Sequence, residues 1–247
     1  MFVPQVKAFG KSDAGLKRSE NEDAFAVRPE LGLFLVADGM GGAAAGALAS
    51  SIFTEAVLEV FSKPEAKSEE KYVDTVNRAF SLAHKRIQDS ARNNPHHMGM
   101  GCTAELLLLF HKSCIVGHVG DSRTYLLRGG QLKQLSKDHS IVQEQLDQGL
   151  ITAAAARKHR LRNIILRAVG VEENLAVDVL RGTTLPEDIF LLCSDGLTDM
   201  VDDISIQETL SSKLSLQSKV EKLIELANSA GGYDNVTVVL CEIESGQ

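Results

Sequence analysis

The feature that most constrains the fold of this chain is the grouping of its apolar runs. Strand-like runs follow one another in blocks, and so do helix-like runs. Parallel sheets need strands that alternate with helices, whereas separate blocks favour an α+β fold with antiparallel sheets. The strands that we expect lie at residues 5–9, 24–28, 33–37, 103–110, 114–119, 124–127, 131–135, 189–193 and 236–242.

Two short connections predict how some of these strands pair. Gly129 and Gly130 separate the run 124–127 from the run 131–135, and Gly-Gly supplies the positive φ angles of a tight hairpin. The run 114–119 passes into 124–127 through Gly120, Asp121 and Ser122. Short connections between successive strands imply antiparallel pairing, so we expect both pairs of neighbours to be hydrogen-bonded.

Three long segments have the apolar spacing of helices, at residues 43–61, 69–93 and 216–229. Residues 139–165 are polar and mixed, and we expect two short helices there, inserted into the strand series. No repeat or Pro-rich linker divides the chain, which predicts a single domain over residues 1–247.

Composition excludes several classes of function. The chain has 26 Lys and Arg against 33 Asp and Glu, a net charge of −7, which argues against a nucleic-acid partner. Its apolar runs are far shorter than the ~20 residues of a membrane span, and the N-terminus lacks a secretory signal pattern. Four scattered cysteines predict buried, reduced thiols and a cytoplasmic location.

Acidic residues stand at the ends of the apolar runs. Asp and Gly form turns, so each site alone has an ordinary explanation. Turn formation is a less good explanation for four such ends together. If these ends share one edge of packed sheets, their carboxylates converge. The four sites are Asp38-Gly39, Asp121, Asp195-Gly196 and Asp234-Asn235.

Converging carboxylates predict a cation site. Buried like charges stay ionised together only where a cation neutralises them. Oxygen ligands without a His or Cys cluster suit Mg²⁺ or Mn²⁺ better than zinc. A further acidic pair, Glu22 and Asp23, precedes an expected strand, and Arg18 lies four residues before Glu22. The Arg18 guanidinium suits a phosphate, although an exposed arginine beside Glu20 is an equally good interpretation.

One other motif weakly indicates a different function, and two phosphatase mechanisms are excluded. Residues 39–44 fit the dinucleotide pattern G-x-G-x-x-A, which would indicate an oxidoreductase. The Asp38 carboxylate would then face a pyrophosphate, and the later strands do not alternate with helices. The chain has no Asp-x-Asp and no Cys followed six positions later by Arg, which excludes aspartyl-phosphate and thiolate phosphatase mechanisms.

Taken together, seven segments resemble the PPM or PP2C family of metal-dependent serine/threonine protein phosphatases, in their compact bacterial form. They are RSENED at 18–23, VADGMGG at 36–42, MGCT at 100–103, GHVGDSR at 117–123, DHS at 138–140, CSDGL at 193–197 and GYDNV at 232–236. The resemblance implies a four-layer αββα sandwich, in which helix pairs flank two packed antiparallel sheets.

The resemblance also implies a role for each site residue. Two catalytic Mn²⁺ or Mg²⁺ ions would be bridged by Asp38, and Arg18 would hold the substrate phosphate. A weaker third ion would lie between Asp121 and Asp195, and residues 139–165 would form a flap beside the site. The ligands implied for the two catalytic ions are Asp38, Asp195, Asp234, the Gly39 carbonyl and Glu22, the last often through water.

The implied reaction is direct attack on phosphorus by a hydroxide that bridges the two ions. Met40 stands where some relatives carry a histidine considered to protonate the leaving group, and His159 in the flap is a candidate for that task. Substrates would be phosphorylated proteins, including a serine/threonine kinase or its targets, and the protein would act as a monomer. The alternative is a catalytically silent phosphoprotein-binding regulator on the same fold.

The flap segment also carries a basic cluster in an otherwise acidic chain. It either attracts acidic phosphopeptides or is a solvated helix end. The cluster comprises Arg157, Lys158, His159, Arg160 and Arg162.

Overall fold

The strands form two antiparallel sheets that pack face to face in the computed structural model, which describes residues 3–62, 68–157 and 159–245. The first sheet has the order β1 (Val6–Asp13), β11 (Val236–Ile243), β10 (Ile189–Cys193), β7 (Arg123–Arg128) and β8 (Gln131–Gln134). The second has the order β2 (Asp23–Arg28), β3 (Leu33–Met40), β5 (Ala104–Phe110), β6 (Ser113–Val119) and β9 (Asp178–Thr183), and the short β4 (Gly101–Cys102) pairs with β3.

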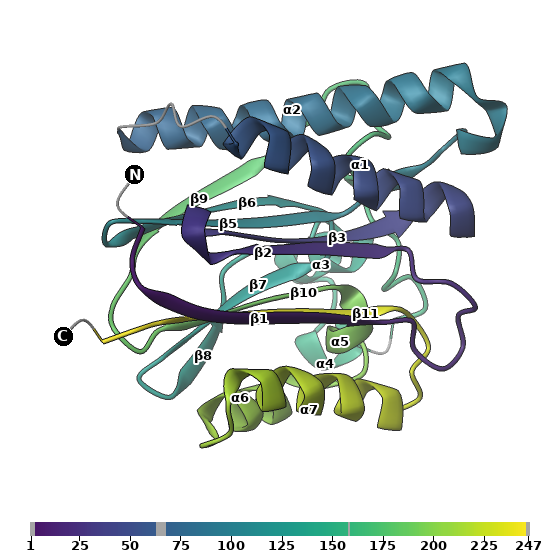
Figure 1. The fold of residues 1–247 in the computed structure, drawn as a ribbon. Helices are drawn as coiled ribbons and strands as arrows, with labels where there is room; N and C mark the ends of the chain where they lie inside the picture. Colours follow the sequence, from purple (N-terminus) through teal and green to yellow (C-terminus); the bar gives the residue numbers. More distant parts are fainter. Residues whose placement is uncertain (1–2, 63–67, 158, 246–247) are drawn as a thin grey trace.

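Helices cover the outer face of each sheet (Figure 1). The helices α1 (Ala43–Phe61) and α2 (Glu69–Asn93) lie on the second sheet, and α6 (Asp203–Ser211) and α7 (Leu216–Ser229) lie on the first, with the short α5 (Asp195–Thr198) beside them. The remaining elements are the flap helices α3 (Ile141–Asp147) and α4 (Ala153–Ala156) and the 3-10 turns Pro29–Leu31 and Pro95–His97. The expected αββα sandwich is therefore confirmed.

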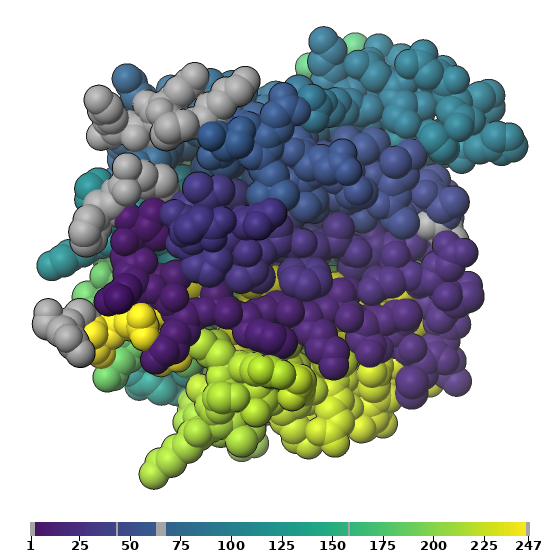
Figure 2. All heavy atoms as spheres, in the orientation of Figure 1, coloured from purple at the N-terminus to yellow at the C-terminus, as the bar shows by residue number. Residues whose placement is uncertain are grey.

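Three apolar clusters hold the four layers together. The inner cluster joins the facing sheets through side chains such as Phe34, Leu107 and Phe190, all without solvent exposure. Each outer cluster joins a sheet to its helices. In Figure 2 the N-terminal segment, in purple, lies between the blue helix layer and the yellow-green one. Since side chains alternate between the two faces of a strand, central strands such as β3 and β10 contribute to the inner cluster from one face and to an outer cluster from the other.

The helix α1 is long and apolar enough to cross a membrane, since residues Ala44–Phe61 have a mean hydropathy of 1.4. Within the fold its buried side chains contribute to the cluster beneath α1 and α2. The ring of Phe53 meets that of Phe80 on α2 edge to face, with centroids 5.1 Å apart. These contacts are those of a core helix.

Most of the expected elements are present. The helices 43–61, 69–93 and 216–229 have the bounds expected from apolar spacing, and the β7–β8 hairpin turns on Gly129 and Gly130 with φ of 57° and 77°. The flap carries two short helices, as expected. All four cysteines are buried and unpaired. Neither β9 nor α6 was anticipated from the sequence.

The expected pairing of β6 with β7 is wrong. These strands belong to different sheets, and β6 pairs with β5 and β9 instead. The turn between them begins at Gly120, which has a φ of 109° and leaves no room for a Cβ beside Thr103. This backbone shape carries the chain from one sheet to the other. As a result, Asp121 lies at the junction of the two sheets.

Candidate active site

The acidic run ends meet at one end of the sandwich. Since β10 and β11 are antiparallel, Asp195 after β10 lies near Asp234 before β11. A cavity of about 310 Å³ opens there. The predicted convergence is confirmed, because this cavity is lined by Arg18, Glu22, Asp38, Gly39, Met40, Gly41, Gly42, Thr103, Asp121, Asn163, Ile165, Asp195, Asp234 and Asn235.

Asp23 does not line the cavity but lies next to Glu22 and opposite Asp38, and the sequence predicted no role for it. It pairs with Asp38 across β2 and β3. Its Oδ2 accepts hydrogen bonds from Thr237 Oγ1 at 2.6 Å and Ser194 Oγ at 2.8 Å, so it ties the second sheet to the first. Its Oδ1 is buried and accepts no hydrogen bond from the part of the chain that the structure describes. The only sequence signal was its place next to Glu22.

Burial and crowding shift the protonation of these acids. Burial raises the pKa of Asp38 well above its ordinary range, and the charges of Asp23, Asp195, Asp121 and Asp234 add to the effect. Burial also raises the pKa of Asp121 to about 7, with help from Asp138. Carboxylates crowded into one cavity repel one another, and cations beside them stabilise their ionised forms.

The donor set fits hard divalent cations. Asp195 Oδ1 is buried and has no hydrogen-bond partner among the described residues, which leaves it available to coordinate an ion. All the charged groups lining the cavity apart from Arg18 are carboxylates, the ligands that Mg²⁺ and Mn²⁺ prefer. Among the described residues no three acidic, imidazole or thiol groups already surround one point closely enough to hold an ion.

Close backbone packing brings Glu22 and Gly39 into the cavity. The Gly39 N–H donates to the Glu22 carbonyl at 3.2 Å. A Cβ at Gly46, in the first turns of α1, would lie 1.8 Å from Glu22 Oε2. Only glycine leaves space for the carboxylate there. Two of the ligands that the resemblance implies, the Glu22 carboxylate and the Gly39 carbonyl, therefore belong to residues that line the acidic cavity.

Arg18 lies at the mouth of this cavity rather than on a remote surface. Its Nη2 donates to Asp234 Oδ2 at 2.8 Å, and its side chain is half exposed. This hydrogen bond and the charge of Asp234 raise the pKa of Arg18. The interpretation of Arg18 as an arginine that merely accompanies Glu20 is not supported.

Asn235 shapes the loop that carries Arg18. Its buried amide donates to the carbonyls of Ala14 at 3.0 Å and Glu20 at 2.9 Å, and its Oδ1 accepts from the Glu22 N–H at 2.8 Å. One side chain thus satisfies three backbone groups of the 14–22 loop. The sequence showed Asn235 only as the neighbour of Asp234.

The flap approaches the cavity through Asn163 and Ile165, not through His159. His159 lines a separate open hollow with Arg160. Lys158 of the predicted basic cluster lies outside the described residues.

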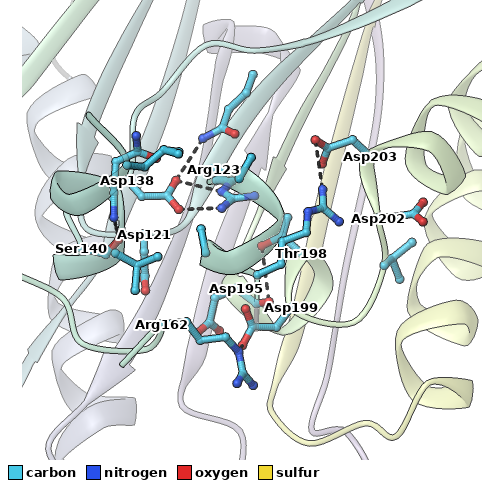
Figure 3. A pocket seen from close by; sticks show the side chains of 18 of the residues that line it. Asp121, Arg123, Asp138, Ser140, Arg162, Asp195, Thr198, Asp199, Asp202 and Asp203 are labelled. Atoms are coloured by element: carbon cyan, nitrogen blue, oxygen red, sulfur yellow. Dashed lines mark hydrogen bonds and ion pairs between the residues drawn. The ribbon is translucent and has the colours of Figure 1, made fainter. Parts of the chain in front are cut away.

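Two arginines of the basic cluster are already paired with the body of the protein. Arg157 lies 3.3 Å from Asp203, and Arg162 lies 3.1 Å from Asp199. They line a neighbouring cavity of about 370 Å³ that shares Asp121 and Asp195 with the acidic one (Figure 3). The basic cluster is therefore not one free, substrate-facing patch.

The fold and the site define a class: an αββα sandwich with a carboxylate-lined cation site at one end of its sheets. The family model for protein phosphatase 2C matches residues 10–145. The serine/threonine phosphatase stp of Listeria welshimeri is 37% identical over 236 residues, 94% of each chain. The chain belongs to the protein phosphatase 2C family.

Solved structures agree with this assignment. The serine/threonine phosphatase PstP/Ppp of Mycobacterium tuberculosis has a TM-score of 0.91 and 34% identity, covering 97% of this chain and 99% of its own. The catalytic domain of PstP in complex with two manganese ions has a TM-score of 0.88 and 33% identity, covering 97% and 99%.

Proposed function

We propose that this protein is a metal-dependent phosphatase that hydrolyses phosphoserine and phosphothreonine in other proteins. The observation that carries the proposal is the cavity in which half-buried carboxylates converge beside a single arginine, Arg18. The names of the relatives, serine/threonine phosphatases, support the substrate class.

The acids divide the work of the site. Asp38, Asp195 and Asp234, with the Gly39 carbonyl and Glu22, would hold two divalent cations, and Asp121 with Asp195 would hold a weaker third. The bound ions would lower the pKa of water and neutralise charge on the phosphoryl group. Arg18 binds the phosphate oxygens by exchanging its hydrogen bond to Asp234 for them. Asp23 is hydrogen-bonded to Thr237 and Ser194 and lies opposite Asp38 in the β2–β3 pair, so it would help to position Asp38.

The cellular setting is also part of the proposal. The substrates include a serine/threonine kinase or its targets, and the protein acts as a monomer in the cytoplasm without a membrane span or a nucleic-acid partner. The buried, unpaired cysteines and the net charge of −7 support this setting. So does the packing of α1, whose apolar face contributes to the core.

The test is hydrolysis of p-nitrophenyl phosphate and of a phosphothreonine peptide with Mn²⁺, with Mg²⁺ and with excess EDTA. We expect turnover with either ion and none in EDTA. Phosphopeptide binding without turnover would instead identify a silent phosphoprotein-binding regulator. Full turnover in EDTA would contradict the metal assignment.

A further inference from the structure

His139, the first residue of the flap, is hydrogen-bonded to the turn that carries Asp121. The backbone N–H of His139 donates to the Gly120 carbonyl at 2.7 Å. In return, Nδ1 of the His139 ring accepts a hydrogen bond from the Gly120 N–H at 3.1 Å. Both backbone groups of Gly120 are thus bonded to one residue, and Asp121 follows Gly120 directly.

These contacts define the tautomer of the ring. Nδ1 accepts, which places the imidazole proton on Nε2. This nitrogen lies 3.2 Å from Asp178 Oδ2 and 3.3 Å from Nη1 of Arg167, which itself donates to Asp178 Oδ1. Burial lowers the pKa of His139, and the charge of His118, whose ring centroid is 4.5 Å away, lowers it further. A lowered pKa favours the neutral ring, which is the form in which Nδ1 can accept from Gly120.

The opposite side of the turn is fixed by Thr103. Its Oγ1 lies 2.6 Å from Ser122 Oγ and accepts from the Asp38 N–H at 3.2 Å. The turn is therefore held between Thr103, which contacts Asp38, and His139, which begins the flap. Neither contact supplies a ligand, but together they hold the backbone of the turn on both sides of Asp121.

His139 also connects the two ends of the flap segment. The His139 carbonyl accepts from the Leu166 N–H at 2.7 Å, which joins the two ends of the flap. The preceding residue, Asp138, is held by two hydrogen bonds from Arg123, 2.8 and 2.6 Å long. A displacement of His139 would therefore reach both the flap and the Asp121 turn.

We propose that His139 is a positioning residue that sets the Asp121 carboxylate for cation binding through the backbone of Gly120. The inference rests on the proposed function, because it takes Asp121 as a ligand. Groups behind metal ligands commonly change metal affinity by about 10- to 100-fold. Since His139 acts through a backbone turn, we expect the lower end of that range.

The chain offers a matched pair of substitutions. In His139→Asn, Oδ1 occupies the place of Nδ1 on Cγ and can still accept from Gly120. In His139→Gln the amide is displaced by one bond, so that acceptor is lost while size and polarity remain. Both variants are made in the wild-type chain and in an Asp121→Asn chain. The readouts are the Mn²⁺ dissociation constants from calorimetry and the Tm in EDTA, which reports any purely structural damage.

We expect His139→Gln to weaken the Asp121-dependent Mn²⁺ binding by about 10-fold and His139→Asn to change it by less than about threefold. In the Asp121→Asn chain the two variants should bind the remaining Mn²⁺ equally, because an effect that acts through Asp121 is not additive with its loss.

Unchanged Mn²⁺ affinity in a folded His139→Gln protein, or equal losses in both backgrounds, would overturn the inference. A loss of Tm in EDTA with unaltered Mn²⁺ affinity would reduce His139 to a structural residue and also overturn it. If the wild-type protein neither binds Mn²⁺ nor hydrolyses p-nitrophenyl phosphate, the proposed function fails together with the inference. The two failures are therefore distinguishable.

Discussion

Arg18 donates a hydrogen bond from Nη2 to Oδ2 of Asp234, a residue 216 positions later in the chain, over 2.8 Å. The pairing of β1 with β11 brings the two loops together, since Asp13 lies opposite Val236. Glu22 and Asp38 add to the negative field around the guanidinium. Arg18 is thus held at the cavity mouth by an acid that also serves as a predicted cation ligand.

Replacing Arg18 should impair phosphate binding. We expect Arg18→Ala to raise KM for p-nitrophenyl phosphate by about 10-fold or more, because hydrogen bonds to charged groups contribute about 1.5–3 kcal/mol. Steady-state kinetics with Mn²⁺ would measure it. Arg28→Ala, an exposed arginine at the other end of β2, is the control and should leave KM unchanged. An Arg18→Ala enzyme with wild-type KM and kcat would exclude Arg18 from phosphate binding.

Removing a central acid should lower the activity and raise the stability of the metal-free protein. We expect Asp38→Asn and Asp195→Asn to lower kcat/KM by more than about 100-fold, since residues that only support metal ligands already contribute about 10- to 100-fold. In EDTA both variants should melt at a higher temperature than the wild type, because burial raises the pKa of each carboxyl and its charge is costly. An active Asp38→Asn enzyme would contradict the ligand assignment.

The metal-free protein should lose stability as the pH rises. Burial raises the pKa of Asp23 to about 6 and that of Asp121 to about 7. Between the ordinary pKa of an unfolded aspartate and these values, the folded state binds more protons than the unfolded state. The free energy of unfolding therefore falls across this range. In EDTA we expect the Tm to drop by roughly 3 °C or more between pH 5 and 7.5, since 1 kcal/mol corresponds to about 2–4 °C at this size.

Two additions test the cause of this drop. Mn²⁺ should abolish the drop in Tm, because the bound cation offsets the repulsion between the ionised carboxylates. Asp121→Asn should flatten its upper part. A Tm that is constant or rises over this range in EDTA would show that the acids are not strained by their mutual repulsion.

The ion pairs of the flap should tune the handling of protein substrates. Arg157 with Asp203 and Arg162 with Asp199 hold the segment that brings Asn163 to the cavity. Partly exposed pairs contribute about 0–1 kcal/mol each, so the double change Arg157→Ala and Arg162→Ala should leave the Tm nearly unchanged. We expect it to raise KM for a phosphopeptide more than for p-nitrophenyl phosphate, and added salt to reduce the difference from the wild type.

Arg160→Ala is the matched control, because Arg160 lines the outer hollow and both ion pairs remain. A larger effect from Arg160→Ala than from the double variant would favour direct attraction of acidic phosphopeptides. Equal effects on both substrates would reject a role of the flap in substrate selection.

Local sequence patterns determined several helices, one hairpin and the grouping of the site acids. The helix α2 begins where the Ser68 side chain accepts from the Lys71 N–H and continues through apolar residues three and four apart, so its bounds could be predicted. Gly129 and Gly130 specified their hairpin in the same way. The carboxylates at the run ends could be predicted as a group because residue type and strand position are both visible in a sequence.

The tertiary structure alone decided which of these groups touch. The edge of β6 is covered by β9, a half-exposed strand with little apolar signal, and so the Asp121 turn crosses between sheets instead of closing a hairpin. The contacts of Asp23 with Thr237 and Ser194, and of His139 with Gly120, join residues from different elements that no local rule brings together. Such contacts depend on how sheets and loops pack in space, and periodicity records only which face a residue takes within its own element.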